Sequence, residues 1–435
     1  MIKSPVKGNE LYSLFQDFSP FDPAFTVKPK DERKTILAAN ANFPFELQVP
    51  AFIGAASLEG GSPLIIQFSG NALAVAGRGI GTAGRTGLSH RPHGELPDIG
   101  ALRYGARLAM TVSNTYIARY SPPFVALALD HFAVPSVKRA IQVQSYKREE
   151  DSGVSPELFD AASETGFQEA EKYLVSRKEA LSILNHAWAF ASMYKVPAPG
   201  QDDLNTWAEY LSSFAYAGAV AGFMACLEEM NPAWAMIDTE EMPPILNYAV
   251  TRQICDLVKE RGFDTVLEAE YGSTGQAGGE EGYLGLHGDE LCGFARQVAG
   301  FVKYTGARGI SYPIGMEHAA PSGQKHEPDL ERLKAVQREI IREVGYYVPF
   351  AQHGGTGAKK LARGLVAKNN INTHFLVAMA QNLLGHFAVS KRTVEQGEKA
   401  ACGSDIYVSA SEAVFVAAVE KLIETGTYGW FRDKR

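Results

Sequence analysis

The sequence predicts an α/β fold, a (β/α)8 TIM barrel. Short apolar runs of strand length alternate with segments of helical periodicity, and each run ends in polar residues. Strands that alternate with amphipathic helices form parallel sheets, and eight such units close into a barrel. An open, doubly wound sheet is the competing architecture.

Eight runs have the apolar character expected of strands that are covered on both faces. In chain order they are TILAANAN (35–42), PLIIQFS (63–69), FVALALDHF (124–132), AMIDTE (235–240), TVLEAEYG (265–272), ARGISYPIG (307–315), VPFAQHGG (348–355) and KNNINT (368–373).

Helical periodicity fills most of the segments between these strands. Apolar residues recur every three or four positions over residues 99–120, 245–262, 293–306 and 329–345. The last three segments end at glycines 262, 306 and 345, where a glycine commonly terminates a helix.

The chain divides into an N-terminal extension (1–34), the barrel (35–390) and a C-terminal helical extension (391–435). A helix-rich insertion at about 140–230 follows the third strand, and we expect it over or beside the barrel mouth. Its apolar run FAYAGAVAGFMACL is too short to span a bilayer, so it predicts a buried helix.

Composition narrows the class of protein. The 435 residues are 46% hydrophobic and 21% charged, as in globular proteins. A net charge of -7 forces no basic face, so we expect neither a nucleic-acid nor a membrane partner. The four cysteines fit no zinc motif or disulfide framework, and the first residues lack an apolar signal core. We therefore expect a cytoplasmic enzyme or binding protein.

Polar residues stand at the end of every predicted strand, where the chemistry of such barrels takes place. Core packing does not require this pattern. In chain order the residues are Asn40 and Asn42, Ser69 and Gly70, Asp130 and His131, Asp238, Glu268 and Glu270, Glu317 and His318, His353 to Gly355, and Asn370, Asn372 and Thr373.

Three histidines of this set, His131, His318 and His353, could converge on a divalent cation and leave a position open for substrate. A single histidine at a strand end is more often a satisfied hydrogen-bonding residue. Three together, with Asp238 and Glu270 at the same end, favour a metal.

Two loops carry further candidates. HGGTG (353–357), which includes Thr356, and NNINT (369–373) follow the seventh and eighth strands, where barrels often bind phosphate. Paired glycines also serve ordinary tight turns. The loop GSTGQAGGEEG (272–282) carries Glu280 and Glu281. It is either a surface loop with solvated acids or a lid that delivers a general base.

Taken together, these motifs resemble the class II, metal-dependent fructose-bisphosphate aldolases and their ketose-bisphosphate aldolase relatives. The matching segments are NAN (40–42), SPLIIQFSG (62–70), ALDH (128–131), MIDTEE (236–241), EAEYGSTG (268–275), the region of His318, HGGTG (353–357) and NNINT (369–373).

The resemblance implies a zinc-dependent aldolase that cleaves or forms a carbon–carbon bond of a ketose phosphate through an enediolate. It also implies no organic cofactor and a homodimer or homotetramer. The implied zinc ligands are His131, His318 and His353, with Asp238 and Glu270 at a possible second metal site. The implied acid–base groups are Asp130 for the C4 hydroxyl and Glu281, with Glu280 as its neighbour, for the proton at carbon 3. The implied substrate and phosphate positions are Asn40, Ser69, Gly354, Gly355, Thr356, Asn370, Asn372 and Thr373.

Some positions depart from the family pattern. Ala319 stands where the family usually has a glycine after its second zinc histidine, and Asn372 stands where it has an aspartate. These departures concern the substrate more than aldol chemistry. Two alternatives stay open: a metal-dependent sugar or sugar-phosphate epimerase or isomerase, and a non-catalytic barrel that binds sugar phosphates.

Overall fold

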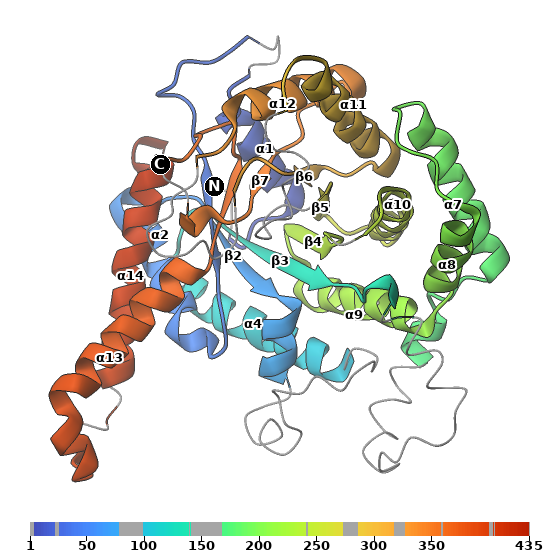
Figure 1. Ribbon diagram of the computed structural model, residues 1–435. Coiled ribbons are helices and arrows are strands. Elements are labelled where there is room, and N and C mark those ends of the chain that lie inside the picture. The colour runs from blue at the N-terminus through green and yellow to red at the C-terminus, as the bar shows by residue number, and fades with distance from the viewer. Residues whose placement is uncertain are drawn as a thin grey trace.

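A single sheet of eight parallel strands forms the centre of the computed structural model (Figure 1). The structure describes residues 4–21, 26–77, 99–138, 140, 168–240, 242–272, 286–316, 327–357, 360–399, 403 and 405–434. The strands are β1 (Ile36–Asn40), β2 (Leu64–Ser69), β3 (Val125–Ala133), β4 (Trp234–Asp238), β5 (Val266–Glu270), β6 (Gly309–Ser311), β7 (Ala351–Gln352) and β8 (Lys368–Ile371).

The sheet order β6-β5-β4-β3-β2-β1-β8-β7 brings the two edge strands, β6 and β7, together. An isolated parallel bridge joins Ile310 to Phe350, and the amide of Ile310 donates to the carbonyl of Pro349 at 3.0 Å. The sheet is therefore a nearly closed barrel, and the predicted (β/α)8 fold is confirmed. Each predicted run contains one of the strands to within a residue at either end.

Helices surround the strands (Figure 1). The four segments predicted from periodicity are helices. The helices are α1 (Gly8–Phe18), α2 (Val49–Ser57), α4 (Ile99–Tyr120), α7 (Arg177–Ser192), α8 (Gln201–Leu211), α9 (Phe214–Met230), α10 (Pro244–Glu260), α11 (Gly288–Thr305), α12 (Leu330–Val344), α13 (Thr373–Glu395) and α14 (Asp405–Thr425).

Successive side chains of each strand point to opposite faces of the sheet, so the strands contribute to two hydrophobic cores. Leu37, Leu64 and Ile66 belong to the larger cluster, which packs the barrel against its helices. Ile36 and Ile65 belong to a second cluster inside the barrel. The second cluster also contains the buried face of α1, so this helix fills the amino-terminal end of the barrel. Its members from α1 are Leu11, Leu14, Phe15 and Phe18.

The segment between β3 and β4 contributes α7, α8 and α9. Helix α7 packs against α8 and against the outer helices α10 and α11, whereas α9 packs against β3 and α4. Within the described residues no single helix is long and apolar enough to cross a membrane. The pair α8 and α9 meets that test by length and composition, with a bend of 51° between them. Most of α9 is buried in the protein.

The C-terminal helices form a hairpin. Helix α13 begins directly after β8 and runs away from the barrel, and α14 returns to pack against α2 and β1 (Figure 1). Phe375 is the buried residue of α13, whereas Leu384 is 71% and Val389 90% exposed. The hairpin therefore presents apolar side chains to solvent.

Candidate active site

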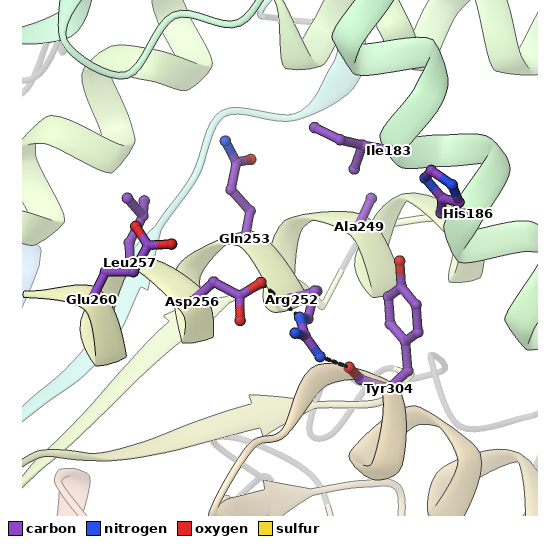
Figure 2. Close-up of a pocket in the computed structure, with 9 residues that line it drawn as sticks. All are labelled: Ile183, His186, Ala249, Arg252, Gln253, Asp256, Leu257, Glu260 and Tyr304. Carbon is purple, nitrogen blue, oxygen red and sulfur yellow. Dashed lines mark hydrogen bonds and ion pairs between the residues drawn. The ribbon is translucent and has the colours of Figure 1, made fainter.

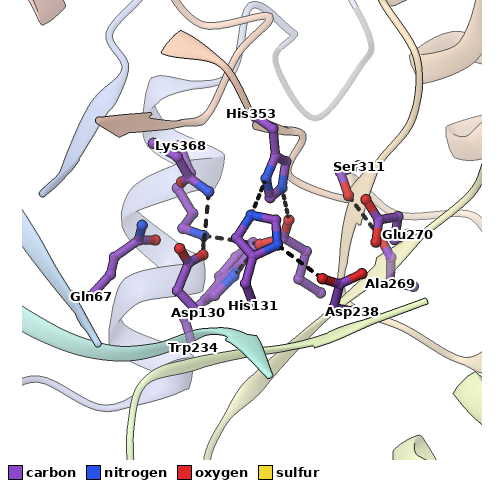
Figure 3. A network of polar contacts seen from close by, with 12 residues as sticks. Gln67, Asp130, His131, Trp234, Asp238, Ala269, Glu270, Ser311, His353 and Lys368 are labelled. Atoms are coloured by element: carbon purple, nitrogen blue, oxygen red, sulfur yellow. Dashed lines mark hydrogen bonds and ion pairs between the residues drawn. The ribbon is translucent and has the colours of Figure 1, made fainter. Parts of the chain in front are cut away.

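Polar side chains from several strands meet inside the carboxyl-terminal end of the barrel (Figure 3). Because successive strand residues point to opposite faces, residues two positions apart point the same way. This parity brings Glu268 and Glu270 of β5 to the interior, and likewise Lys368 and Asn370 of β8. The candidate site is thus built largely on the strands of the barrel.

Asp130 of β3 is buried beneath the centre of this cluster. The amide of Asn40 donates to its carboxylate at 2.7 Å and that of Asn370 at 3.4 Å. Gln67 donates to the Asn40 carbonyl oxygen at 2.6 Å and so orients that amide. Burial raises the pKa of Asp130, but the positive charges of His131 and Lys368 outweigh burial and hold it below its usual value. Asp130 is therefore ionised.

The backbone at His131 is irregular. The register between β3 and β4 shifts between Leu129 and Phe132, and His131 has a φ of +41°. Adjacent strand residues normally face opposite sides of a sheet, and a bulge redirects one of them. This bulge turns the His131 ring into the same cluster as its neighbour Asp130. Left-handed backbone at a residue other than glycine is uncommon and is often found at functional sites.

His131 and His353 face each other. His131 Nε2 lies 2.8 Å from His353 Nδ1. On their far sides, His131 Nδ1 lies 3.5 Å from Asp238 and His353 Nε2 lies 2.8 Å from Glu268. Burial lowers the pKa of His131, but Asp130 and Asp238 outweigh burial and raise it to about 10.

This pair fits a cation-binding role. Histidines that bind metals commonly give their other ring nitrogen to a carboxylate, which fixes the tautomer and the ring orientation. His131 and His353 both have such a carboxylate. Among the described residues no group of three or more histidine, cysteine, aspartate or glutamate side chains has the arrangement of a metal site. His318, the third predicted ligand, lies outside the described residues.

The acids predicted at the second metal site lie beside this pair. Glu270 is buried, and its carboxylate accepts the backbone N–H of Thr239 at 3.3 Å. Asp238 accepts the backbone N–H of Glu240 at 3.2 Å. Glu270 is one of the negative charges that raise the pKa of His131. Both acids therefore place negative charge beside His131.

The predicted phosphate positions cluster beyond β7 and β8. Gly354 has a φ of +66°, in the left-handed region that favours glycine. A Cβ atom at Gly355 would lie 2.2 Å from the side-chain oxygen of Asn369, so only glycine fits there. A short 3-10 helix (Gly355–Gly357) follows, and Thr356 on it is exposed. The loop thus turns tightly against β8.

The remaining predicted positions lie at the neighbouring strand ends. Asn372 accepts the side-chain amide of Asn42 at 2.8 Å, which links the ends of β8 and β1. Ser69 accepts the backbone N–H of Ala72 at 3.1 Å, and Thr373 is exposed at the start of α13. Glu280 and Glu281 lie outside the described residues.

Sequence reasoning assigns no role to four buried members of the cluster: Gln67, Trp234, Glu268 and Lys368. The sequence contains a signal that three of them face the site. Gln67, Glu268 and Lys368 each lie two positions before a residue predicted for the site, on the same face of the same strand. A polar or charged residue inside an otherwise apolar strand requires a partner within the barrel. Trp234 carries no such signal.

A groove of about 560 Å³ lies elsewhere, between α7 and α10 (Figure 2). Arg252 spans its floor and donates to Asp256 at 2.7 Å and to the carbonyl of Tyr304 at 2.7 Å. His186 of α7 lines the opposite side. The candidate catalytic groups, Asp130, His131 and His353, lie in the polar cluster of the barrel and not in this groove.

The fold and the site together define a (β/α)8 barrel with a buried polar centre of the kind found in enzymes. Residues 219–427 match the model of the family described as Fructose-bisphosphate aldolase class-II. The resemblance inferred from the motifs is thereby confirmed. No curated protein matches the sequence.

A solved structure agrees with the fold. Fructose-bisphosphate aldolase from Campylobacter jejuni aligns with a TM-score of 0.56 and 16% identity, over 98% of this chain and 96% of that one. The YdjI aldolase from Escherichia coli K12 aligns over 91% of this chain and 93% of that one, with 17% identity and a TM-score of 0.46. At 16% identity the likeness to the Campylobacter jejuni structure extends to the fold alone.

Proposed function

We propose that the protein is a zinc-dependent aldolase that cleaves or forms a carbon–carbon bond of a ketose phosphate. The family match over residues 219–427 supports the reaction class. The observation that carries the proposal is the pair His131 and His353, each paired with a carboxylate, beside the ionised Asp130. His318 completes the proposed ligand set, and Asp238 and Glu270 form the proposed second metal position.

The protein's own groups account for the proton transfers. Asp130 accepts the proton of the C4 hydroxyl as the bond between carbons 3 and 4 breaks, and Asn40 and Asn370 hold its carboxylate in place. Glu281, with Glu280 beside it, returns a proton to carbon 3. A bound divalent cation supplies Lewis-acid stabilisation of the negative charge that develops on the substrate.

Substrate binding belongs to the strand-end loops. Backbone N–H groups of Gly354 and Gly355 and the hydroxyl of Thr356 are the proposed phosphate contacts, because successive exposed N–H groups bind anions. The other proposed contacts are Ser69, Asn370, Asn372 and Thr373 at neighbouring strand ends. Because residue 355 is a glycine, the loop backbone can lie close to β8.

Assembly and location complete the proposal. We expect a homodimer or homotetramer, since a second copy would cover exposed apolar side chains such as Leu384 and Val389 on α13. A purely monomeric mass in light scattering would contradict this. We also place the protein in the cytoplasm, because the described cysteines Cys226, Cys255 and Cys292 are free thiols.

The test is metal analysis followed by a screen of ketose phosphates for cleavage. The purified protein should contain about one equivalent of zinc or take it up, and cleavage should yield two shorter fragments. His131→Ala and His353→Ala should lose most metal and activity, whereas His186→Ala, remote from the cluster, should retain both. A rearranged product of unchanged length would indicate an epimerase or isomerase. A protein that takes up no metal would favour a non-catalytic barrel.

A further inference from the structure

Glu268, to which the proposed mechanism gives no role, lies buried among charged and polar side chains. Its carboxylate joins three strands across the barrel. Oxygen Oε2 accepts the ammonium of Lys368 at 2.9 Å and the indole N–H of Trp234 at 2.6 Å. Oxygen Oε1 lies 2.8 Å from Nε2 of His353. The side chains of all three partners and of Glu268 are almost completely buried.

The donors around Glu268 determine which of its carboxylate oxygens faces His353. An ammonium and an indole N–H can only donate hydrogen bonds, so the atom between them must be an oxygen acceptor. Lys368 and Trp234 therefore engage one carboxylate oxygen and leave the other facing His353. A carboxylate oxygen can only accept, so the Nε2 atom of His353 carries the proton.

The tautomer of His353 follows from this contact. A neutral imidazole carries one proton, so its Nδ1 atom keeps a lone pair when Nε2 is protonated. That Nδ1 atom faces His131 Nε2 at 2.8 Å. A ring nitrogen with a free lone pair is the form that binds a metal ion.

Packing of neighbouring residues holds the indole of Trp234 in place. Trp234 fits because Gly309 on β6 has no side chain, and a Cβ atom there would lie 2.5 Å from the indole. Phe15 of α1 packs edge-on against the same indole at 5.5 Å between ring centres. Lys368 Nζ lies 5.1 Å from the centre of the Trp234 ring. The indole therefore contacts both the helix inside the barrel and the charge cluster.

We propose that Glu268, held by Lys368 and Trp234, is the positioning residue that sets the tautomer and orientation of His353 for cation binding. The role of this tautomer in cation binding rests on the proposed function. The tautomer itself is a property of the metal-free protein. Glu268 touches neither substrate nor cation in this role.

Glu268→Gln provides a sharp test. Lys368 and Trp234 retain the amide oxygen, so the amide NH2 turns toward His353 and forces its Nε2 atom to become an acceptor. The proton then moves to Nδ1, the nitrogen that faces His131. We expect the affinity for Zn2+ to fall by about 10–100-fold. Glu343→Gln on α12, remote from the cluster, is the matched control and should bind Zn2+ like the wild type.

Two measurements decide the outcome. Competition with a chromophoric chelator gives the affinity for Zn2+. Nitrogen-15 spectra of histidine-labelled, metal-free protein give the tautomer of His353, assigned from the signal that His353→Ala removes. Wild-type protein should show protonated Nε2 and unprotonated Nδ1. Protonated Nδ1 in the wild type would overturn the proposal, even if Glu268→Gln does not fold.

An unchanged tautomer together with unchanged affinity in a folded Glu268→Gln protein would also overturn it. The proposed function fails separately. A wild type that neither binds Zn2+ nor cleaves ketose phosphates would refute the aldolase, while the tautomer in metal-free protein would still test Glu268.

Discussion

Asp130 combines burial with charge at the residue scale, as Glu268 does, but only Asp130 is also held by the amides of Asn40 and Asn370 among their described contacts. Two amides donate to its carboxylate and two cationic side chains lower its pKa. Such an arrangement keeps a base ionised where water has little access. Its geometry depends on the amides of Asn40 and Asn370, which approach from β1 and β8.

Asp130→Asn removes the base and preserves the shape of the side chain. We expect kcat for ketose-phosphate cleavage to fall by about 10²–10⁴-fold, the usual contribution of a positioned acid–base group. Zinc content should stay close to that of the wild type. Steady-state kinetics and metal analysis of the same preparation check both statements. Asp256→Asn in the groove between α7 and α10 is the control, and an equal loss there would contradict the assignment.

Lys368→Met should destabilise the protein strongly. The substitution leaves the buried Glu268 carboxylate without its ammonium partner, and breaking a buried pair in this way costs roughly 3–5 kcal/mol. The free energy of unfolding from urea titration measures the loss. Lys303→Met removes a surface ion pair with Glu343 instead, and should cost at most about 1 kcal/mol. Similar losses in the two variants would show that burial of the pair is unimportant.

The sequence predicts the residue types of the site better than their partners. Asp130, His131, Asp238 and His353 stand out because each ends a strand, and the structure brings these four together. Their contacts depend on strands far apart in the chain. That Glu268 of β5 contacts His353, which directly follows β7, results from barrel closure, which no local pattern encodes.

At the scale of elements, α1 is an integral part of the barrel although it precedes the first strand. The amide of Gly8 donates to Asp264 before β5 at 2.9 Å, and a Cβ atom at Gly8 would lie 2.6 Å from that carbonyl oxygen. The helix therefore packs against the barrel backbone at close range. Its buried face continues the interior core toward Trp234.

Phe15→Ala tests that role. The deleted ring leaves a cavity between α1 and Trp234, and truncation of a fully buried phenylalanine costs about 3–5 kcal/mol. Thermal or urea unfolding measures the change. Tyr104→Ala, at a side chain that is 61% exposed, is the control and should change stability by no more than about 0.5 kcal/mol. Equal stability of the Phe15 variant and the wild type would mean that α1 is not part of the cooperative fold.

Periodicity predicts elements well because it is local. Residues 99–120 match α4 at both ends, and glycines 306 and 345 end α11 and α12 in the left-handed conformation. Packing partners are harder to predict. The run 214–227 is expected within an insertion, whereas α9 lies directly against β3 and α4. The proposed domain boundaries at about 140–230 therefore stay a prediction.

At the scale of the whole molecule, cation binding should raise stability. A ligand that binds the folded state alone, at 100 times its dissociation constant, adds about 2.7 kcal/mol. Calorimetry with and without a chelator measures this as a higher Tm for the zinc-loaded protein. His353→Ala should lose most of the increase. An equal increase in that variant would place the stabilising cation elsewhere.

The barrel is closed more weakly between β6 and β7 than between its other neighbouring strands. Seven strand interfaces are ladders of paired residues, one of them interrupted by the bulge between β3 and β4, but β6 meets β7 through the bridge between Ile310 and Phe350. Local opening requires the least free energy where the fewest backbone hydrogen bonds must break. Amide protons along this seam should therefore exchange with solvent sooner than those of β1 to β5. Because His353 directly follows β7, the protein can fluctuate beside its most reactive groups while the rest of the barrel stays closed.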